Sequence, residues 1–402
     1  MSKFVKLSSI AELTVGFVGT MAKHYGDEGI PFLRSLNIKP FKIIGDDMKY
    51  VSAEFSNSLS KSILHKGDVV IVRTGIPGTC CVVPAEYDGC NCSDVVIVHP
   101  NTELVNPHYL AAYINVWGQR QIANNKVGAI QQHFNVHSAE EMLIFLPDIT
   151  EQEKIAKMIV ALNGKIENNT SVCAKLESMA KTLYDYWFTQ FDFPDENGKP
   201  YRSSGGEMVW NDQLNREIPK GWEVTSIGSV TQNYDSKRIP LSQNERDTMK
   251  GDVPYYGATG VMDYVNRHIF EGHFVLIAED GSVMDAKGSP IVQMIWGKTW
   301  VNNHAHVLQG CNGYSNELLY LLLQHVPVVK IMTGSIQKKI NQYNLNNYRI
   351  PQIPNSISHA FYDIVEPMFA KVRTLRLENG ELTKLRDWLL PMLMNGQAVV
   401  SD

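Results

Sequence analysis

The chain repeats a short glycine-led motif, and this repeat constrains the fold more than any other feature of the sequence. The motif GAIQQHF runs from Gly128 to Phe134, and GSIQKKI runs from Gly334 to Ile340, so the offset is 334 − 128 = 206 residues in a chain of 402. Each copy precedes a Leu-Pro or Ile-Pro step and a long helical pattern. A repeat of half the chain predicts two related structural units rather than one continuous fold.

Each half ends in an apolar pattern with alternating spacings of three and four, which is the seam of a coiled coil. The first seam consists of Ile159, Leu162, Ile166, Asn169, Cys173, Leu176, Ala180, Leu183 and Trp187. The positions 206 residues later are Val365, Met368, Val372, Leu375, Asn379, Leu382, Arg386, Leu389 and Leu393. Each seam holds one Asn, a residue that weakens a seam but fixes its register. Arg386 is the exception in an otherwise matching second seam.

The two seams predict long helices over roughly 155–187 and 361–393, each about 48 Å long at 1.5 Å per residue. A narrow apolar stripe is not stable alone in water, so we expect the two helices to pair with each other. The alternative is that each helix packs on its own domain. Thr150 with Glu153 predicts a capping box at the first helix start. Pro367 should kink the second helix or mark its true start.

Short β-rich runs broken by Gly, Pro and Asn precede each helix. The stretches at 67–75 and 272–281 both read as a buried strand that ends in a glycine turn. The fold class is therefore α+β, with two mostly β domains joined by two long antiparallel coiled-coil helices in a pseudo-twofold repeat. The expected boundaries are 1–149 for the first domain, 150–188 for the first helix, 189–221 for a connector, 222–354 for the second domain and 355–395 for the second helix.

The net charge is −5, which argues mildly against a protein that coats nucleic acid by bulk charge. Two windows nevertheless contain no Asp or Glu, from Leu104 to Ala139 and from Leu318 to Tyr362, and each contains one copy of the repeated motif. Local positive potential of this kind suits a confined surface that faces phosphate. Chance clustering is the alternative.

Several classes of protein are disfavoured by what the sequence lacks. No apolar run approaches a membrane span, and the N-terminus lacks the apolar core of a signal peptide, so we expect a cytoplasmic protein without a membrane partner. Neither a phosphate loop nor a glycine-rich cofactor turn is present. NPHY at Asn106–Tyr109 is better explained as a helix N-cap followed by Pro than as a methyltransferase motif.

Possible metal ligands also have simpler explanations. Four of the six cysteines lie in CCVVPAEYDGCNC, without the paired CxxC spacing of a zinc site, and are expected to be small apolar residues in paired strands. His304 and His306 share one face of a predicted strand, and structural histidines are favoured over metal ligands there. We therefore expect no catalytic, cofactor-binding or metal site in this chain.

The chain resembles the specificity subunit of type I restriction–modification systems. The resemblance rests on both repeated motifs and on LPDITEQEKIAKMI, IPKGWEVTSIGSV, VPYYGATGVMDYV, IFEGHFVLIAEDGS, NNHAHVL and the connector GKPYRSSGGEMVWN. It covers nearly the whole chain, and the combination is specific although no single motif is. The second helix begins PNSISHAFYDIVEP rather than with the family's usual acidic start, and the first domain lacks the Trp found at Trp222.

The resemblance implies a non-catalytic DNA-binding subunit. Two target-recognition domains would each recognise one half of an asymmetric, bipartite sequence in double-stranded DNA, and the helices would set the spacer. Two methyltransferase subunits that carry S-adenosylmethionine would be its partners, together with motor-nuclease subunits that use ATP and Mg²⁺. A helix pair of about 48 Å exceeds one duplex turn of about 34 Å, as such a spacer requires.

The residues that touch DNA are less closely defined by the sequence. Glutamines can pair with adenine edges, lysines and arginines can contact phosphate, and tyrosines can stack or contact the sugar–phosphate backbone. For each there is a structural alternative: a loop hydrogen bond, a solvated surface, a domain carboxylate or a core tyrosine. The candidates are Arg34, Arg73, Gln131, Gln132, Tyr255, Tyr256, Thr259, Lys287, Asn303, Gln337, Lys338 and Lys339.

Two other functions stay open at this point. One is a free-standing, two-headed DNA-binding regulator without methyltransferase or nuclease partners. The other is an enzyme, such as a nuclease, with a site that the sequence does not reveal.

Overall fold

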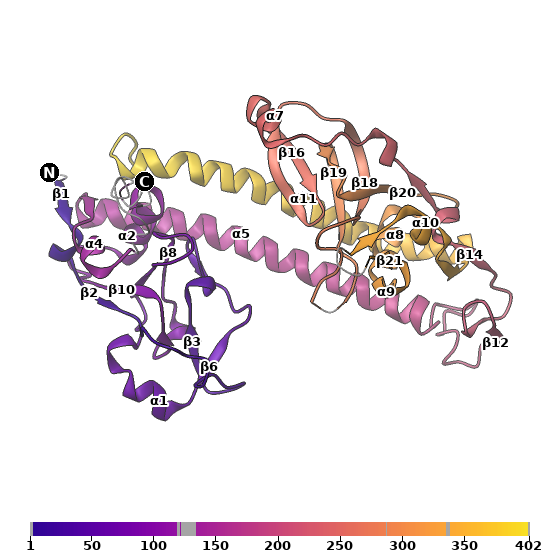
Figure 1. Ribbon diagram of the computed structural model, residues 1–402, viewed down its shortest axis with the longest axis horizontal. Helices are drawn as coiled ribbons and strands as arrows, with labels where there is room; N and C mark the ends of the chain where they lie inside the picture. The colour runs from indigo at the N-terminus through magenta and orange to yellow at the C-terminus, as the bar shows by residue number, and fades with distance from the viewer. Residues whose placement is uncertain (1–2, 119–120, 122–133, 287, 335–337, 401–402) are drawn as a thin grey trace. The chain divides into compact units, whose positions relative to one another are not determined.

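The chain forms two compact units, each containing one mostly β region and parts of both long helices. A computed structural model describes residues 3–118, 121, 134–286, 288–334 and 338–400. The first unit comprises Met1–Asn169 and Glu378–Asp402, and the second comprises Thr170–Leu377. Figure 1 shows the course of the chain through these elements.

The first unit is built on a four-stranded antiparallel sheet with the order β2-β10-β7-β8. Its strands are β2 (Ala11–Val15), β10 (Val95–Pro100), β7 (Val69–Val72) and β8 (Cys80–Val82). All four residues of β7, Val-Val-Ile-Val, are buried, as expected for β-branched residues in an inner strand. The core therefore lies on both faces of this sheet.

Smaller elements surround that sheet. The strands are β1 (Lys3–Lys6) paired with β11 (Leu143–Leu146), β6 (Lys49–Val51) with β3 (Ile30–Leu33) and β9 (Asn91–Cys92), and β4 (Ile38–Lys39) with β5 (Lys42–Ile43). The helices are α1 (Ala53–Ser58), α2 (Pro107–Tyr113) and α4 (Val136–Glu140), with short turns η1 (Leu7–Ser9), η2 (Ser35–Asn37), η3 (Ser60–Ser62), η4 (Ala85–Tyr87) and η5 (Ile114–Gly118).

The interpretation of NPHY as a helix start is confirmed. The side chain of Asn106 accepts hydrogen bonds from the backbone N–H groups of His108 and Tyr109, and Pro107 occupies the first turn of α2. The Asn side chain thus satisfies donors that a helix N-terminus leaves free, and Pro has no N–H that would need a partner there.

The cysteines of the first unit are small core residues in and beside its strands. Cys80 and Cys81 lie in β8 and Cys92 lies in β9, and all three are fully buried. Burial raises the pKa of the Cys90 thiol to about 12 and raises the pKa of Cys81 as well. Thiols that stay protonated are poor metal ligands and poor nucleophiles, which fits the structural interpretation.

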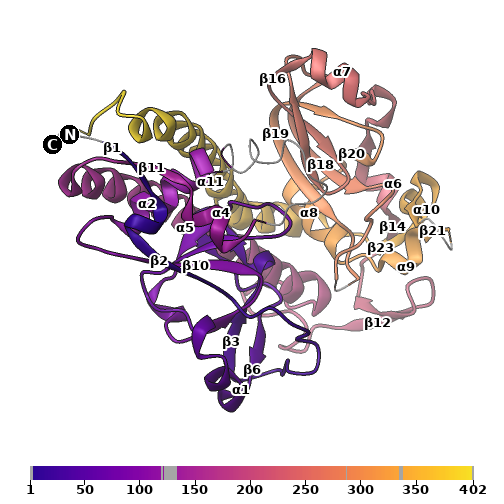
Figure 2. The ribbon, with the colours of Figure 1, turned by 60° about the vertical axis from the view of Figure 1, so that its left-hand side comes forward.

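The second unit has a larger sheet with the strand order β15-β20-β18-β19-β16-β17, of which Figure 2 labels β20, β18, β19 and β16. Its strands are β15 (Thr231–Asn233), β20 (Ala305–Gly310), β18 (Phe270–Ala278), β19 (Val292–Val301), β16 (Lys250–Gly257) and β17 (Gly260–Val265). Three two-stranded pairs complete the strands of this unit. They are β14 (Val224–Ser226) with β23 (Arg349–Pro351), β21 (Met332–Thr333) with β22 (Lys339–Ile340), and β12 (Met208–Asn211) with β13 (Arg216–Pro219). The helices and turns are η6 (Asp185–Thr189), α6 (Ile227–Val230), η7 (Asp235–Lys237), α7 (Gln243–Thr248), α8 (Asn316–Gln324), α9 (Val328–Ile331) and α10 (Gln342–Asn347).

The two units repeat one topology. The order β2-β10-β7-β8 in the first corresponds to β15-β20-β18-β19 in the second, and the terminal pair β1-β11 corresponds to β14-β23. In both units a helix, α2 or α8, follows the strand that lies second in this order. The second unit adds the hairpin β16-β17 at the edge of its sheet. The predicted α+β class and its internal repeat are confirmed.

The two long helices begin about six residues before the stretches that the seams cover, at or next to the expected boundaries of 150 and 355. They are α5 (Ile149–Tyr184) and α11 (Asn355–Met394). The predicted capping box of Thr150 and Glu153 is wrong, because Thr150 already lies inside α5 and the carboxylate of Asp148 accepts the N–H of Glu151. Pro367 does not mark the start of the second helix, because α11 begins twelve residues before it, at Asn355.

In the first unit the helices pair antiparallel through polar contacts. The amide of Asn169 donates to Asn379 Oδ1 at 2.9 Å, and Asn379 Nδ2 donates to the carbonyl oxygen of Ile166 at 3.1 Å. Further along the pair, Arg386 donates to Asn163 Oδ1 at 2.9 Å. Its guanidinium also lies 5.1 Å from the ring centroid of Phe41, so the one charged seam position is used for contact with the β region.

In the second unit the helices pair through apolar contacts and an ion pair. Cys173 packs with Val372 and Leu375, and Glu177 forms an ion pair with Arg376 at 2.5 Å. At the end of α5, aromatic side chains of η6 surround Phe361 of α11, which is fully buried. The antiparallel pairing that the seams predicted is therefore present in both units.

Candidate nucleic-acid interface

Several turns of the second unit are brought together by hydrogen bonds at one part of its sheet. The amide of Gln293 donates to the carbonyl oxygens of Gly257 and Ala258, at 3.1 and 2.9 Å, and so fixes the turn between β16 and β17. The N–H of Asn302, in the turn between β19 and β20, donates to the carbonyl oxygen of Tyr256 at 3.0 Å. The sheet thus places two turns of different hairpins next to each other.

The end of the second repeated motif joins the same region. Lys339 Nζ lies 3.3 Å from an oxygen of Asp280, and Asp280 also hydrogen-bonds His304 in the turn after β19. The N–H of Glu279 donates to the carbonyl oxygen of His304 at 2.8 Å. Lys339 keeps 48% of its side chain exposed, so it still presents a positive charge to solvent beside these turns.

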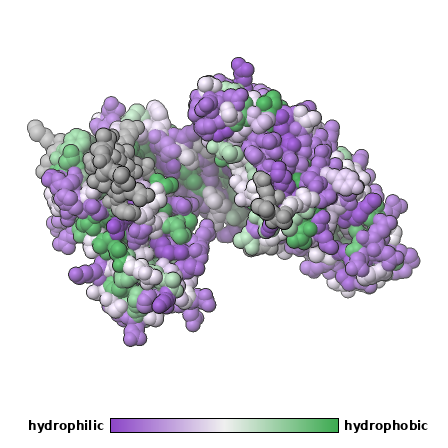
Figure 3. All heavy atoms as spheres, viewed as in Figure 1, coloured by the Kyte–Doolittle hydropathy of each residue, from purple (hydrophilic) through white to green (hydrophobic). Residues whose placement is uncertain are grey.

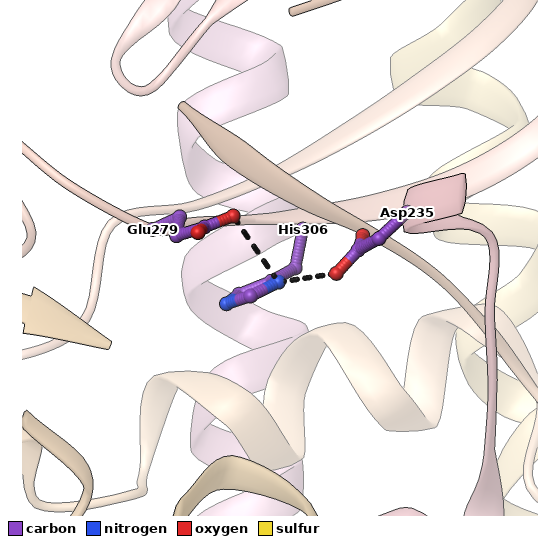
Figure 4. A group of neighbouring side chains, drawn as sticks. All are labelled: Asp235, Glu279 and His306. Atoms are coloured by element: carbon purple, nitrogen blue, oxygen red, sulfur yellow. Dashed lines mark hydrogen bonds and ion pairs between the residues drawn. The ribbon is translucent and has the colours of Figure 1, made fainter. Parts of the chain in front are cut away.

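Behind these turns lies a group of charged side chains (Figure 4). His306 of β20 is 2% exposed, and its Nδ1 lies 2.5 Å from Asp235 Oδ2 and 3.6 Å from Glu279 Oε2. Its other ring nitrogen, Nε2, lies 2.8 Å from the carbonyl oxygen of Ile340. Arg238 neutralises the carboxylates, with Nη1 at 2.7 Å from Glu279 and Nη2 at 3.5 Å from Asp235.

The hydrogen bonds determine the charge of His306. Both ring nitrogens face acceptors, and only the doubly protonated imidazolium can donate from both. Burial lowers the pKa of His306, but the hydrogen bond to Asp235 and the nearby carboxylates outweigh burial, so the pKa is raised above 6.5. The pKa of Asp235 is lowered by His306 against the opposing effect of burial.

Asp235, Glu279 and His306 offer ligand atoms within 4.8 Å of one another, a spacing that could hold a metal ion. A metal would have to displace His306 from the Ile340 carbonyl or from Asp235, and would compete with Arg238 for Glu279. Two cations already balance the two carboxylates, so the arrangement favours a buried ion-pair network. The sequence offered no third ligand for His306 because Asp235 and Glu279 lie 71 and 27 residues away from it.

In the first unit, each of the two predicted arginines follows a strand, β3 for Arg34 and β7 for Arg73. Arg34 Nη2 lies 3.0 Å from Asp47 Oδ2, and its side chain is 17% exposed. This is the domain carboxylate that the sequence analysis offered as the alternative to a DNA groove. Arg73 follows β7, and its Nε donates to the carbonyl oxygen of Phe134 at 3.1 Å. Asp94 connects the two positions, since it accepts hydrogen bonds from the residues that follow them, Ser35 and Thr74.

The remaining candidates divide by exposure. Tyr255 is 1% exposed and its hydroxyl accepts the N–H of Leu241, so it is a core residue in this structure. Tyr256 and Lys338 are half-buried, whereas Thr259 and Asn303 are exposed in the two turns described above. Gln131, Gln132, Lys287 and Gln337 lie outside the described residues. The structure thus brings Thr259, Asn303 and Lys339 into one region.

The fold and this arrangement agree with a known family. Residues 219–385 match the family model described as the type I restriction modification DNA specificity domain. This part of the chain is therefore similar to the DNA specificity domain of type I restriction–modification systems, as the sequence motifs predicted.

Individual relatives carry the same description. The chain is 26% identical over 281 residues to the type I restriction enzyme MjaIX specificity subunit of Methanocaldococcus jannaschii, over 65% of this chain and 62% of that one. It is 23% identical over 423 residues to the type I restriction enzyme HindI specificity subunit of Haemophilus influenzae, over 87% of this chain and 91% of that one. The MjaIX subunit is therefore matched over less than two thirds of its own length.

A solved structure shows the same fold. The crystal structure of the type I restriction–modification S subunit from M. genitalium superposes with a TM-score of 0.57 at 16% identity, over 98% of this chain and 96% of that one. Identity at this level supports the fold and not the target sequence.

Within the residues that the structure describes, no helix is long and apolar enough to cross a membrane. In Figure 3 the visible face of each unit is mostly hydrophilic, with scattered hydrophobic residues.

Proposed function

We propose that this chain is the DNA-recognition subunit of a type I restriction–modification complex and that each β region recognises one half of a bipartite target. The observation that carries the proposal is the repeat of one topology with different turns. The second unit has the extra hairpin β16-β17, and it has an acid, Glu279, where the first unit has Arg73. Two units that share one sheet topology but differ in their turns can recognise two different half-sites.

The exposed side chains support direct contact with DNA. Thr259, Asn303 and Lys339 project from adjacent turns of a rigid sheet, the kind of scaffold on which recognition loops are usually carried. The chain as a whole is acidic, so partner subunits would supply much of the phosphate contact.

The remaining roles belong to other subunits in this proposal. Methyltransferase subunits would carry S-adenosylmethionine, and motor-nuclease subunits would use ATP and Mg²⁺. The chain itself would be non-catalytic. The alternative is a free-standing DNA-binding regulator, and it predicts that DNA methylation does not depend on this gene.

Exchanging residues 222–353 for the equivalent domain of another family member tests the proposal. Adenine methylation is mapped across the genome of cells that carry the partner subunits with the parent chain, the exchanged chain or no specificity subunit. We expect the exchange to replace one half of the methylated sequence and leave the other half and the spacing unchanged. A change in both halves would contradict the modular recognition, and methylation that persists without the gene would favour the regulator.

The role of α5 and α11 as a spacer predicts a second result. Inserting one heptad into each helix adds about 10 Å to the pair, or about three base pairs of duplex. The same methylation map should then show both half-sites unchanged and the spacer longer by that amount. Insertion into only one helix is the matched control, since it puts the two seams out of register and should abolish methylation. An unchanged spacer after the double insertion would contradict the ruler role.

A further inference from the structure

The two copies of the repeated motif end in residues that are held in the same way. Phe134 and Ile340 lie 206 residues apart at equivalent positions, and both are buried. The backbone carbonyl of each accepts a hydrogen bond from a cationic side chain. Arg73 Nε donates to Phe134 at 3.1 Å, and His306 Nε2 donates to Ile340 at 2.8 Å.

The two cations come from different places in the repeat. Glu279 is the residue that lies 206 positions after Arg73, so the second unit has an acid where the first has the arginine. The imidazolium of His306, on the neighbouring strand β20, provides the donor instead. Asp235 and Glu279 face this imidazolium, and Arg238 in turn pairs with both carboxylates.

The same segment has further attachments in the second unit. The N–H of Ile340 donates to the carbonyl oxygen of Glu279 at 2.8 Å, so the peptide groups on both sides of this residue are fixed. Lys339 pairs with Asp280, which also binds His304. Orientation of Lys339 toward the turns at Thr259 and Asn303 therefore depends on how firmly Ile340 is anchored.

We propose that Arg73 and His306 are positioning residues that anchor the ends of the two repeated motifs, and that only the second anchor responds to pH. The anchor itself is independent of function; its effect on DNA rests on the function proposed above. An arginine stays charged at all ordinary pH values, whereas a histidine does not.

The direction of the pH effect follows from the contacts. Because the folded protein raises the pKa of His306, its stabilising contribution is complete below about pH 6.5 and is lost as the pH rises through the folded-state pKa. A neutral imidazole has one N–H and can keep only one of its two hydrogen bonds. The other charged groups near it are Asp235 and Arg238 from η7 and its C-cap, Glu279 after β18, and the Lys339–Asp280–His304 set beside Ile340.

Hydrogen exchange in the full-length chain tests the anchor. Exchange at the Ile340 amide is measured at pH 6 and pH 9, corrected for the intrinsic rate, and compared with the amide of Leu321 in α8. We expect protection of Ile340 to fall roughly tenfold relative to Leu321, the effect of losing one charge-assisted hydrogen bond. In His306→Gln, protection should be low and independent of pH. The exposed His268→Gln is the matched control and should behave as the parent chain.

The outcomes separate the anchor from the proposed function. The anchor proposal would be overturned if protection of the Ile340 amide in the parent chain did not change with pH. It would also be overturned if the His306→Gln variant kept the pH response of the parent chain. Retained protection of Leu321 shows that the variant is folded. If His306→Gln unfolds the second unit, the proposal is tested only by the pH dependence of Ile340 protection in the parent chain.

The proposed effect on DNA is tested by measuring the DNA affinity of the complex that contains the methyltransferase subunits. The duplexes carry the target sequence that the methylation map defines. As the pH rises, the affinity for DNA should fall more steeply for the parent than for His306→Gln. The same difference should appear with a duplex in which only the second unit's half-site is intact. A pH-sensitive anchor without this difference would overturn the link to DNA and leave the proposed recognition function intact.

Discussion

Replacing Phe361 by alanine is expected to lower the free energy of unfolding of the second unit by about 3–5 kcal/mol. The ring is fully buried and lies against Phe188 and Trp187, with centroid distances of 4.9 and 5.4 Å. Removing it leaves a cavity where α11 meets the end of α5, and the large neighbouring rings cannot collapse into it without loss of their own contacts.

Denaturant unfolding followed by the fluorescence of the tryptophans measures this change. Leu377→Ala is the matched control, because Leu377 lies on the same helix and is 66% exposed; its effect should stay within about 0.5 kcal/mol. If the two variants lost similar stability, the packing of α11 on α5 in this unit would differ from the structure described here.

The helical part of the fold was predictable from sequence because its signal is periodic and local. Seam positions such as Val372 and Ile159 are buried, and both Asn residues of the seams meet in one hydrogen bond. The capping residue of α5 was wrong, because the capping signal was assigned to Thr150, whereas Asp148, two residues earlier, has its carboxylate in reach of the first turn. Short-range capping chemistry depends on backbone geometry that a sequence pattern does not specify.

The candidate interface was less predictable because its contacts join distant parts of the chain. Thr259 was a candidate as part of the stretch PYYGATG, which is a local feature of the sequence. Tyr255 could not be distinguished from an exposed tyrosine, because its burial depends on packing against Val265 of β17 and Trp300 of β19. The charged group around His306 was missed for the same reason: three separate segments supply its members, and no spacing in the sequence connects them.

Replacing Arg238 by methionine is expected to cost the second unit about 3–5 kcal/mol, because removal of one partner leaves a largely buried carboxylate uncompensated. Arg238 is 12% exposed, and besides its ion pairs it donates to the carbonyl oxygens of Asp235 and Ala305, at 3.1 and 2.7 Å. The methionine side chain has similar length and fills much of the same space, so the loss measures charge and hydrogen bonding more than packing.

A second substitution distinguishes a charge network from a simple structural arginine. Adding Glu279→Gln to Arg238→Met removes the carboxylate that lost its partner, so the double variant should recover about half of the lost stability. Lys220→Met, which breaks the exposed pair with Glu207, is the matched control and should cost less than about 1 kcal/mol. Equilibrium unfolding of the full-length chain measures the parent, Arg238→Met, Glu279→Gln, the double variant and Lys220→Met. If the losses in the free energy of unfolding simply added in the double variant, Arg238 and Glu279 would act independently. The balance of two cations against two carboxylates would then not be the interaction that stabilises this part of the sheet.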